Sequence, residues 1–200
     1  MPQTPTDSTP GLRERKKAQT REAIQTHAMT LFMQQGYAAT TVEQIIRGVD
    51  VSESTFFRYF PTKESLVFTD DFDPVILAVF AAQPKSMGVM DALRHAFREL
   101  FETLSGDQRR EVHDRIGLFL AVPALRAAAF EQLSTTMDRI ASAIAERIGR
   151  EPDDFAVLVV AGAVVGASMA ALAALAVDPE ADYAQLVDDA MAQLQAGVPF

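Results

Sequence analysis

The sequence predicts an all-α fold of about nine to ten helices, because three observations agree. Apolar residues recur three and four positions apart through most of the 200 residues, which is the spacing of one helix face. Glycine, proline and short polar clusters interrupt this pattern at intervals of helix length. No segment alternates apolar and polar residues long enough to predict a strand. We therefore expect a helical head, residues 12–66, and a larger helical body, residues 67–200.

Composition excludes several kinds of function. The chain has no cysteine, which excludes disulfides, thiolate catalysis and cysteine–metal sites. The net charge is −9, but residues 1–66 hold eight Lys/Arg and seven Asp/Glu, whereas residues 67–200 hold ten and twenty. The acidic charge therefore lies in the body, and the near-neutral head is compatible with a nucleic-acid partner. Residues 1–11 are polar and proline-rich, which predicts a disordered tail and no signal peptide. We expect a cytoplasmic protein without cofactor or metal.

The first helix is expected from Leu12 to Gln35. Its apolar residues fall at offsets 0, 4, 7 and 8 from Ile24, and Gly36 ends it. Basic residues cluster near its start, at Arg13, Arg15, Lys16, Lys17 and Arg21. Such a cluster is typical of a solvated helix face, but it also suits contact with DNA phosphates, and both interpretations stay open.

Two short helices joined by a tight turn are expected next. The first, about 42–49, has apolar residues at offsets 0, 3, 4 and 7. Two capping boxes are available at its start: Thr40 with Glu43, or Thr41 with Gln44. Asp50 tolerates the turn, and Ser52 can cap a second helix, about 53–59.

The second helix is too short to stand alone. Phe56, Phe57 and Phe60 are expected to anchor it, Pro61 to end it, and Thr62 to cap a fourth helix.

A helix, a tight turn and a second short helix form the helix-turn-helix plan, in which the second helix enters the major groove. Outward hydroxyl, carboxylate and basic groups suit base edges and phosphates. Glu53 is expected to accept a hydrogen bond from a cytosine amino group, and Lys63, at a helix N-terminus, to contact a phosphate. The expected DNA contacts are Lys17, Arg21, Thr40, Thr41, Ser52, Glu53, Ser54, Thr55, Arg58, Tyr59 and Lys63. The alternative is a three-helix core with a solvated polar face.

This stretch resembles the TetR family of bacterial transcriptional regulators, whose pattern is roughly T-x-x-x-I-A-x-x-A-G-V-S-x-G-T-x-Y-x-x-F-x-x-K-x-x-L. The residues that match in register are Thr41, Ile45, Val51, Ser52, Thr55, Phe60, Lys63 and Leu66. The sequence departs from the pattern at Asp50 for the turn glycine, Ser54 for a small residue and Phe57 for a tyrosine. The tyrosine's hydrogen bond to phosphate is then missing, and Arg58 or Tyr59 would have to compensate. The resemblance implies a dimeric DNA-binding protein whose body binds a small effector.

In the body, Asp73 and Pro74 are expected to break the chain and couple the head to the effector pocket, with Asp73 capping a short helix at about 74–82. The further expected helices are about 89–104, 108–122, 124–148, 155–177 and 183–194.

A body rich in phenylalanine can enclose an apolar cavity. The expected lining is Phe80, Phe97, Phe101, Phe119, Phe130, Met137 and Met169. Ordinary core packing is the alternative for each of them. The body contains the segments DDFDP (70–74) and LAVPALRAAAFEQL (120–133), followed by an Ala/Gly/Val-rich helix. In these segments it resembles the mycofactocin-regulator type of C-terminal domain, which implies an acyl-coenzyme-A-like ligand. If that ligand carries phosphates, the expected partners are Arg94, Arg98, Arg115 and Arg126.

Residues 155–177 contain no charged residue. The length would span a bilayer, but both flanks are acidic and carry no Lys/Arg bias or aromatic belt, so we expect no membrane insertion. A helix that is apolar all round is otherwise buried on every side, here by a second copy of the chain. We expect a homodimer in which the last two helices, about 155–177 and 183–194, pair with their mates in a four-helix interface. The expected dimer contacts are Val160, Val164, Ala167, Ala171, Leu186 and Met191.

The mechanism implied is a homodimer whose two heads reach successive major grooves roughly 34 Å apart, and whose effector shifts the population of body geometries. The family resemblance makes repression the default. Two alternatives remain: a helical enzyme acting on an acyl ligand, and a membrane-anchored regulator. No catalytic residue is expected, because His27, His95 and His113 lack metalloprotease spacing and no glycine-rich phosphate loop or serine elbow is present.

Overall fold

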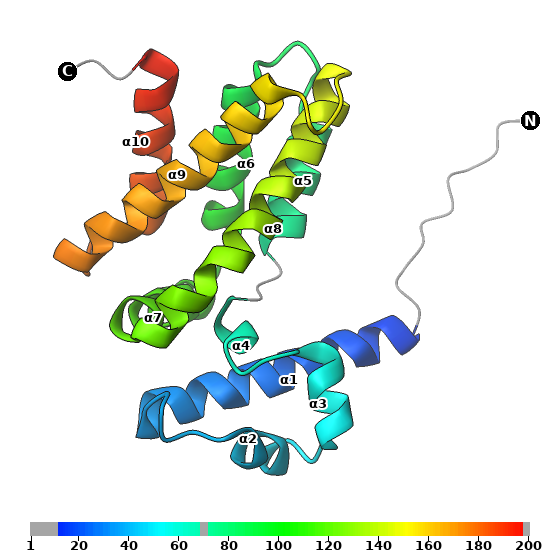
Figure 1. Cartoon of the computed structure of the whole chain (residues 1–200), viewed down its shortest axis with the longest axis vertical. Coiled ribbons are helices and arrows are strands. Elements are labelled where there is room, and N and C mark those ends of the chain that lie inside the picture. Colours follow the sequence, from blue (N-terminus) through cyan, green and yellow to red (C-terminus); the bar gives the residue numbers. More distant parts are fainter. Residues whose placement is uncertain (1–11, 69–71, 198–200) are drawn as a thin grey trace, which may run out of the picture. The chain divides into compact units, whose positions relative to one another are not determined.

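The computed structural model describes residues 12–68 and 72–197, apart from the side chains of Leu12, Glu14, Phe130 and Glu131. Every regular element in this part of the chain is a helix, so the all-α prediction is confirmed (Figure 1). The predicted tail, residues 1–11, lies outside the described residues. The helices are α1 (Leu12–Gln35), α2 (Val42–Gly48), α3 (Glu53–Tyr59), α4 (Ser65–Phe68), α5 (Phe72–Ala82), α6 (Val89–Thr103), α7 (Gly106–Ala121), α8 (Pro123–Ile148), α9 (Phe155–Val177) and α10 (Tyr183–Ala196).

The chain divides into two compact units, which we call the head (Met1–Val67) and the body (Phe68–Phe200). In the head, α1 contributes an inner face that includes Ile24 and Phe32, and α3 contributes Phe56 and Phe60, all of them fully or almost fully buried. Burial of each phenylalanine stabilises the head by about 2 kcal/mol. This burial explains how the seven-residue α3 persists, since an isolated helix of that length is unstable in water.

The body is a bundle in which α9 lies between α8 and α10 (orange between yellow-green and red in Figure 1). Helix α6 contacts both α5 and α10. The core draws on each of these helices and includes Phe80, Leu93, Ile144, Val164 and Met191.

Arg147, in the last turn of α8, is a buried residue of the body that lacks an acidic partner among the described residues. Its guanidinium lies 5.2 Å from the centre of the Phe80 ring. It donates hydrogen bonds to the backbone carbonyls at and beyond the end of α5, those of Phe80, Gln83, Pro84 and Met87. The charge is compensated by carbonyl dipoles at a helix C-terminus, which attract a cation.

Two predicted helix starts are wrong by a few residues. Helix α4 begins at Ser65 rather than directly after Thr62, although Thr62 does accept the backbone N–H of Ser65. Helix α5 begins at Phe72, so Asp73 lies inside its first turn instead of capping it. The Asp73 carboxylate instead accepts contacts of 3.4 Å from Thr136 and Arg139 on α8.

Among the described helices, α9 alone has the length and composition that would allow a membrane crossing. A core helix of a water-soluble protein meets the same criteria, so this observation is weak evidence of a membrane.

Candidate DNA-binding surface and body groove

The two short helices of the head are held by local hydrogen bonds that the sequence predicted. The Thr41 hydroxyl accepts the backbone N–H of Gln44, and the Gln44 side chain accepts the N–H of Thr41, which completes the capping box. Asp50 adopts a left-handed conformation with φ of 52°, which asparagine and aspartate tolerate better than most residues. The Ser52 hydroxyl accepts the N–H of Thr55 at 3.2 Å and caps α3. These contacts fix the angle between α2 and α3.

Gly48 ends α2 against His27 of α1. A Cβ placed on Gly48 would lie 1.9 Å from Nε2 of His27, so no larger residue fits without a shift of the ring. The close contact sets how near α2 lies to α1. No sequence pattern predicts this contact, because the two residues are distant in the chain.

Most of the predicted DNA contacts are exposed or half-buried on the head: Lys17, Arg21, Thr41, Ser52, Glu53, Ser54, Thr55, Arg58, Tyr59 and Lys63. The Ser52 hydroxyl contacts the hydroxyls of Ser54 and Thr55 at 3.0 and 2.9 Å. The Arg58 guanidinium lies 5.2 Å from the centre of the Tyr59 ring. Helix α3 therefore presents a row of hydroxyl, carboxylate and guanidinium groups on its exposed side.

Thr40 does not face outward as predicted. Its side chain is 1% exposed, its hydroxyl donates to the carbonyl of Gly36, and it accepts a hydrogen bond from Gln35. Thr41 serves as the cap instead, which leaves Thr40 to close the turn after α1. A direct DNA contact from this hydroxyl would require it to leave the core.

Lys63 is half-buried and its ammonium already has partners. Nζ donates hydrogen bonds of 2.7 and 2.8 Å to the carbonyls of Tyr37 and Thr40. Burial lowers the pKa of Lys63, and the neighbouring Glu64 partly opposes this. Since an ammonium has three donors, Lys63 retains one N–H beyond these two bonds for any phosphate.

Phe57 is not the anchor that the sequence predicted. Phe56 and Phe60 are fully buried, whereas Phe57 is 42% exposed on the outer side of α3. Phe56 and Phe60 are four positions apart and share the buried face of α3, as predicted. Phe57 is one position further along the helix than Phe56, so it cannot face the core with them. An apolar ring therefore lies beside the polar row of α3.

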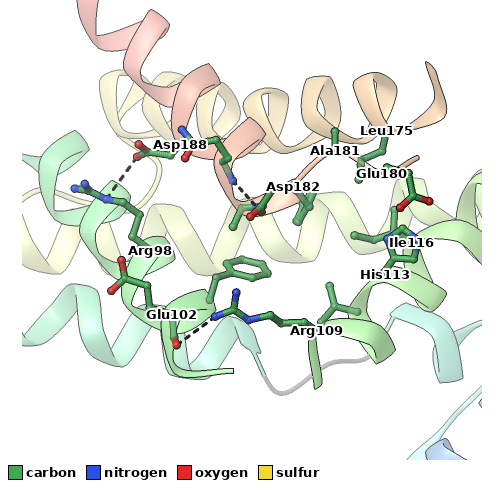
Figure 2. Close-up of a pocket in the computed structure, with 15 residues that line it drawn as sticks. Arg98, Glu102, Arg109, His113, Ile116, Leu175, Glu180, Ala181, Asp182 and Asp188 are labelled. Carbon is green, nitrogen blue, oxygen red and sulfur yellow. Dashed lines mark hydrogen bonds and ion pairs between the residues drawn. The ribbon is translucent and has the colours of Figure 1, made fainter. Parts of the chain in front are cut away.

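The body contains a groove of about 460 Å³ between the C-terminal half of α6, the N-terminal half of α7, and the turn from α9 into α10 (Figure 2). Apolar side chains line its middle, among them Phe101, Val112, Ile116 and Leu175. The rings of Phe101 and Tyr183 meet edge to face at 5.9 Å. The volume is that of a site for a small organic molecule.

Of the six predicted lining residues whose side chains are described, Phe101 alone lines this groove. Phe80 and Met137 belong to the core or pack against it, as does the half-buried Phe97. Phe119 lies 6.0 Å from the ring of Phe68, and Met169 is 37% exposed on α9. The side chain of Phe130 lies outside the described part of the structure. Aromatic residues at helical spacing mark apolar faces, but they do not reveal which faces enclose a space.

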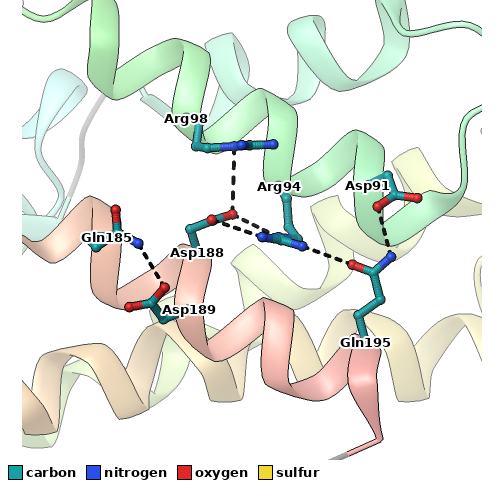
Figure 3. Close-up of polar contacts among 7 residues, drawn as sticks. All are labelled: Asp91, Arg94, Arg98, Gln185, Asp188, Asp189 and Gln195. Carbon is teal, nitrogen blue, oxygen red and sulfur yellow. Dashed lines mark hydrogen bonds and ion pairs between the residues drawn. The ribbon is translucent and has the colours of Figure 1, made fainter.

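A polar cluster joins α6 to α10 at one end of the groove (Figure 3). Arg94 donates to both carboxylate oxygens of the buried Asp188, at 2.8 and 3.0 Å. Arg98 lies farther away, with Nε 3.8 Å from the same carboxylate. Hydrogen bonds from Arg94 lower the pKa of Asp188, against the opposing effect of burial. Asp188 therefore stays ionised and paired at neutral pH.

The other two predicted phosphate partners, Arg115 on α7 and Arg126 on α8, already have hydrogen-bond partners within the chain. Arg115 donates to Glu111 at 2.7 Å, and Arg126 donates to the carbonyl of Leu120. Neither lines the groove. In the described part of the chain no group of three or more acidic or histidine side chains is arranged to hold a metal ion.

The predicted dimer contacts on α9 and α10 are buried in, or packed against, the core of their own chain. Val164, Ala167 and Ala171 are buried in the core of their own chain, as is Met191 of α10, and Val160 and Leu186 pack against that core. The face of α9 that remains exposed is also apolar and includes Phe155, Val159, Gly166, Ala170, Ala173 and Val177. A helix that is apolar all round does not indicate which face its own chain covers.

Sequence comparison places both units among known regulators. Residues 24–69 match the profile described as "Bacterial regulatory proteins, tetR family", and residues 87–199 match that of the "MftR C-terminal domain". The chain is 33% identical over 156 residues to the HTH-type transcriptional regulator TcmR of Streptomyces glaucescens, covering 74% of this chain and 69% of TcmR.

Solved structures give the same fold. The TetR-family repressor FadR of Thermus thermophilus, solved in complex with lauroyl-CoA, is similar with a TM-score of 0.54 and 26% identity, over 90% of this chain and 95% of FadR. SmeT of Stenotrophomonas maltophilia, the repressor of the multidrug efflux pump SmeDEF, has a TM-score of 0.57 and 18% identity, over 90% and 96%.

Proposed function

This chain belongs to the TetR family of DNA-binding transcriptional regulators, and from that premise we propose that it is a homodimeric repressor released from its operator by a small effector. The single observation that carries the proposal is the capped α2–turn–α3 unit, whose second helix keeps Glu53, Ser54 and Arg58 exposed. A seven-residue helix with buried phenylalanines on one side and polar groups on the other suits insertion into a major groove. Such a regulator would act in the cytoplasm, where the DNA is, and we propose no catalytic role for it.

The basic residues of α1 support the same role. Arg13, Arg15, Lys16 and Lys17 are all exposed. Within the described part of the N-terminal half of the chain, this segment of α1 has the highest density of positively charged residues. Phosphate contacts from lysine and arginine fix a protein's register on the duplex without reading its sequence. We propose that Lys17 and Arg21 make such contacts while α3 reads base edges.

We further propose that two copies pair through the exposed face of α9. Phe155 is 80% exposed and Val177 88% exposed, and both lie on one face with Val159. An apolar face this long is costly to leave in water, since each Å² of apolar surface contributes about 25 cal/mol when buried. The glycine and alanines in the middle of the face would let two helices approach closely. Pairing by a two-fold axis would present two heads to one operator.

An effector in the body would change this assembly's affinity for DNA by favouring one body geometry over another. FadR, to which this chain is similar, was solved in complex with lauroyl-CoA. We propose an acyl-coenzyme-A-like or other hydrophobic effector on the basis of that similarity and of the match of the body to the MftR C-terminal domain.

The test is footprinting of the full-length protein on DNA upstream of its own gene, with and without candidate acyl and hydrophobic ligands. We expect a protected palindromic region at low salt, and weaker protection in the presence of an effector. In parallel, Glu53→Ala should relax base preference at one position of each half-site, because a carboxylate there would accept from a cytosine amino group. Absence of protection on every fragment at low salt would refute the proposal.

A further inference from the structure

The charged side chains that line the groove of the body are mostly acidic. Two arginines, Arg98 and Arg109, line it, against four carboxylates: Glu102, Glu180, Asp182 and Asp188. The body as a whole holds ten Lys/Arg and twenty Asp/Glu. A polyanion entering this groove would meet an unfavourable potential.

Several of these charges are already committed within the chain. Arg94 pairs both oxygens of Asp188, and Asp182 caps α10 by accepting the N–H groups of Ala184 and Gln185. Arg109 donates to the backbone carbonyls of Leu104 and Glu102, at the end of α6. These groups are satisfied without a ligand.

The side chains that remain available are predominantly acidic. Within the described residues, the carboxylates of Glu102 and Glu180 have no hydrogen-bond or ion-pair partner. Glu102 and Glu180 lie toward opposite ends of the groove (Figure 2), which is also lined by the edge-to-face ring pair of Phe101 and Tyr183. The opposing cation is Arg98, whose side chain is 52% exposed and whose nearest acid is already paired.

We propose that this groove is the effector site and that it takes a compact aromatic or alicyclic molecule bearing an amine, rather than an acyl-coenzyme-A. This proposal rests on the proposed function and narrows it. The apolar middle would hold the ring system, and an ammonium would lie between the aromatic edge pair and either Glu102 or Glu180. Cations are attracted both by carboxylates and by aromatic faces. A coenzyme A thioester, in contrast, brings several phosphate charges to a groove whose two arginines, Arg98 and Arg109, already have partners within the chain.

The occupant would also lie against α10. Asp188, Gln185 and Tyr183 all line the groove and belong to that helix. Asp188 ties α10 to α6 through Arg94, so a molecule held there contacts both partners of that connection. Ligand in the groove is therefore positioned to alter the spacing of α6 and α10.

The experiment uses the full-length protein and four fluorescent probes that share an anthracene ring and differ at one carbon. The groups are methylammonium, hydroxymethyl, carboxylate, and the coenzyme A thioester of that carboxylate. Binding is followed by fluorescence anisotropy at low salt. We expect the ammonium probe to bind about tenfold more tightly than the carboxylate, since two exposed carboxylates each contribute modestly. The thioester should bind most weakly.

Three variants test the assignment to these residues. The double variant Glu102→Gln/Glu180→Gln removes two negative charges with little change in side-chain volume. It should lower the affinity for the ammonium probe about fivefold and change the affinity for the hydroxymethyl probe by less than about twofold. Arg98→Gln removes a positive charge from the groove and should therefore raise the affinity for the ammonium probe. Glu151→Gln, an exposed acid in the turn after α8, is the matched control and should change nothing.

The outcomes are separable from those of the operator test. Tightest binding of the thioester, an unchanged ammonium affinity in the double variant, or no binding of any probe would each overturn the ligand assignment. If the same preparation protects its operator, the regulator proposal stands even then. If the ammonium probe binds as expected but no operator is protected, the ligand class stands and the regulatory role falls.

Discussion

The ammonium of Lys63 lies 4.0 Å from the centre of the Tyr37 ring and donates a 2.7 Å hydrogen bond to the carbonyl of the same residue. The Tyr37 hydroxyl in turn donates to Glu64 at 2.7 Å. Burial, together with this hydrogen bond, raises the pKa of Tyr37 well above its usual range. The lysine that the sequence motif assigns to DNA therefore also joins α4 to the turn between α1 and α2.

Lys63→Met should destabilise the head by about 2 kcal/mol, because two charge-assisted hydrogen bonds to half-buried carbonyls are lost. Urea denaturation measures this effect. Lys17→Met is the matched control: Lys17 is exposed, so the free energy of unfolding should not change while operator affinity falls. A Lys63→Met variant of unchanged stability would show that the carbonyl contacts contribute little.

Gly48→Ala should destabilise the head by about 1–3 kcal/mol, since the added methyl overlaps the His27 ring. The double variant with His27→Ala should recover most of this loss, because the ring that clashes is gone. Thermal unfolding of the two single variants and the double variant gives the coupling between the sites. Additive losses would place the cost of the alanine elsewhere than at His27.

Asp188→Asn should destabilise the body by about 3 kcal/mol, because Arg94 then loses the carboxylate that pairs it in a partly buried site. Asp189→Asn, next in the chain and exposed, is the control. The pH dependence has a defined sign: the folded pKa of Asp188 is lowered from its ordinary value of 3.8. Its contribution is thus present above pH 3.8 and is lost as the pH falls through the folded pKa. Denaturation from pH 7 downward, with the asparagine variant as reference, measures the difference.

Val159→Glu should give a folded monomer if the exposed face of α9 joins two copies. Burying an unpaired carboxylate in an apolar interface should raise the dimer dissociation constant about 100-fold or more. Light scattering after size-exclusion chromatography reports the mass. Ser142→Glu, on the exposed side of α8, should leave the mass of the dimer unchanged. A Val159→Glu protein that stays dimeric would exclude this face.

Phe57→Tyr should tighten operator binding about threefold, because the exposed ring would regain the phenol that the family pattern uses toward phosphate. Anisotropy with labelled operator measures the affinity. Phe56→Tyr serves as a contrast, since it places a hydroxyl in the closed core and should destabilise the head instead. An unchanged affinity for Phe57→Tyr would mean that the ring does not face a phosphate.

The sequence was sufficient for features that depend on neighbours in the chain. The cap at Ser52, the turn at Asp50 and the extent of α9 all follow from local rules, and the structure confirms them. Of the two capping boxes that the sequence left open at the start of α2, the structure shows the one between Thr41 and Gln44. Contacts between distant residues could not be read in this way. Nothing in the pattern pairs Arg94 with Asp188, or aligns Gly48 with His27.

The side of α9 that the same chain covers could not be predicted for a related reason. Val164 and Val159 are chemically alike, and the choice between them depends on where α8 and α10 lie, not on the helix itself. The same holds for the groove. Its walls come from three separate segments, and of the predicted aromatic residues with described side chains only Phe101 lies where these segments meet.

The four carbonyls held by Arg147 have a mechanical consequence. A guanidinium bonded at once to residues 80, 83, 84 and 87 leaves the turn between α5 and α6 little freedom to move independently of α8. Displacement of the last turn of α8 would be passed directly to the start of α6, the helix whose far end forms one wall of the groove. A conformational change in the bundle is thus expected to move α5, α6 and α8 together. Helix α7 has no fully buried side chain among its described residues and is expected to be displaced most easily.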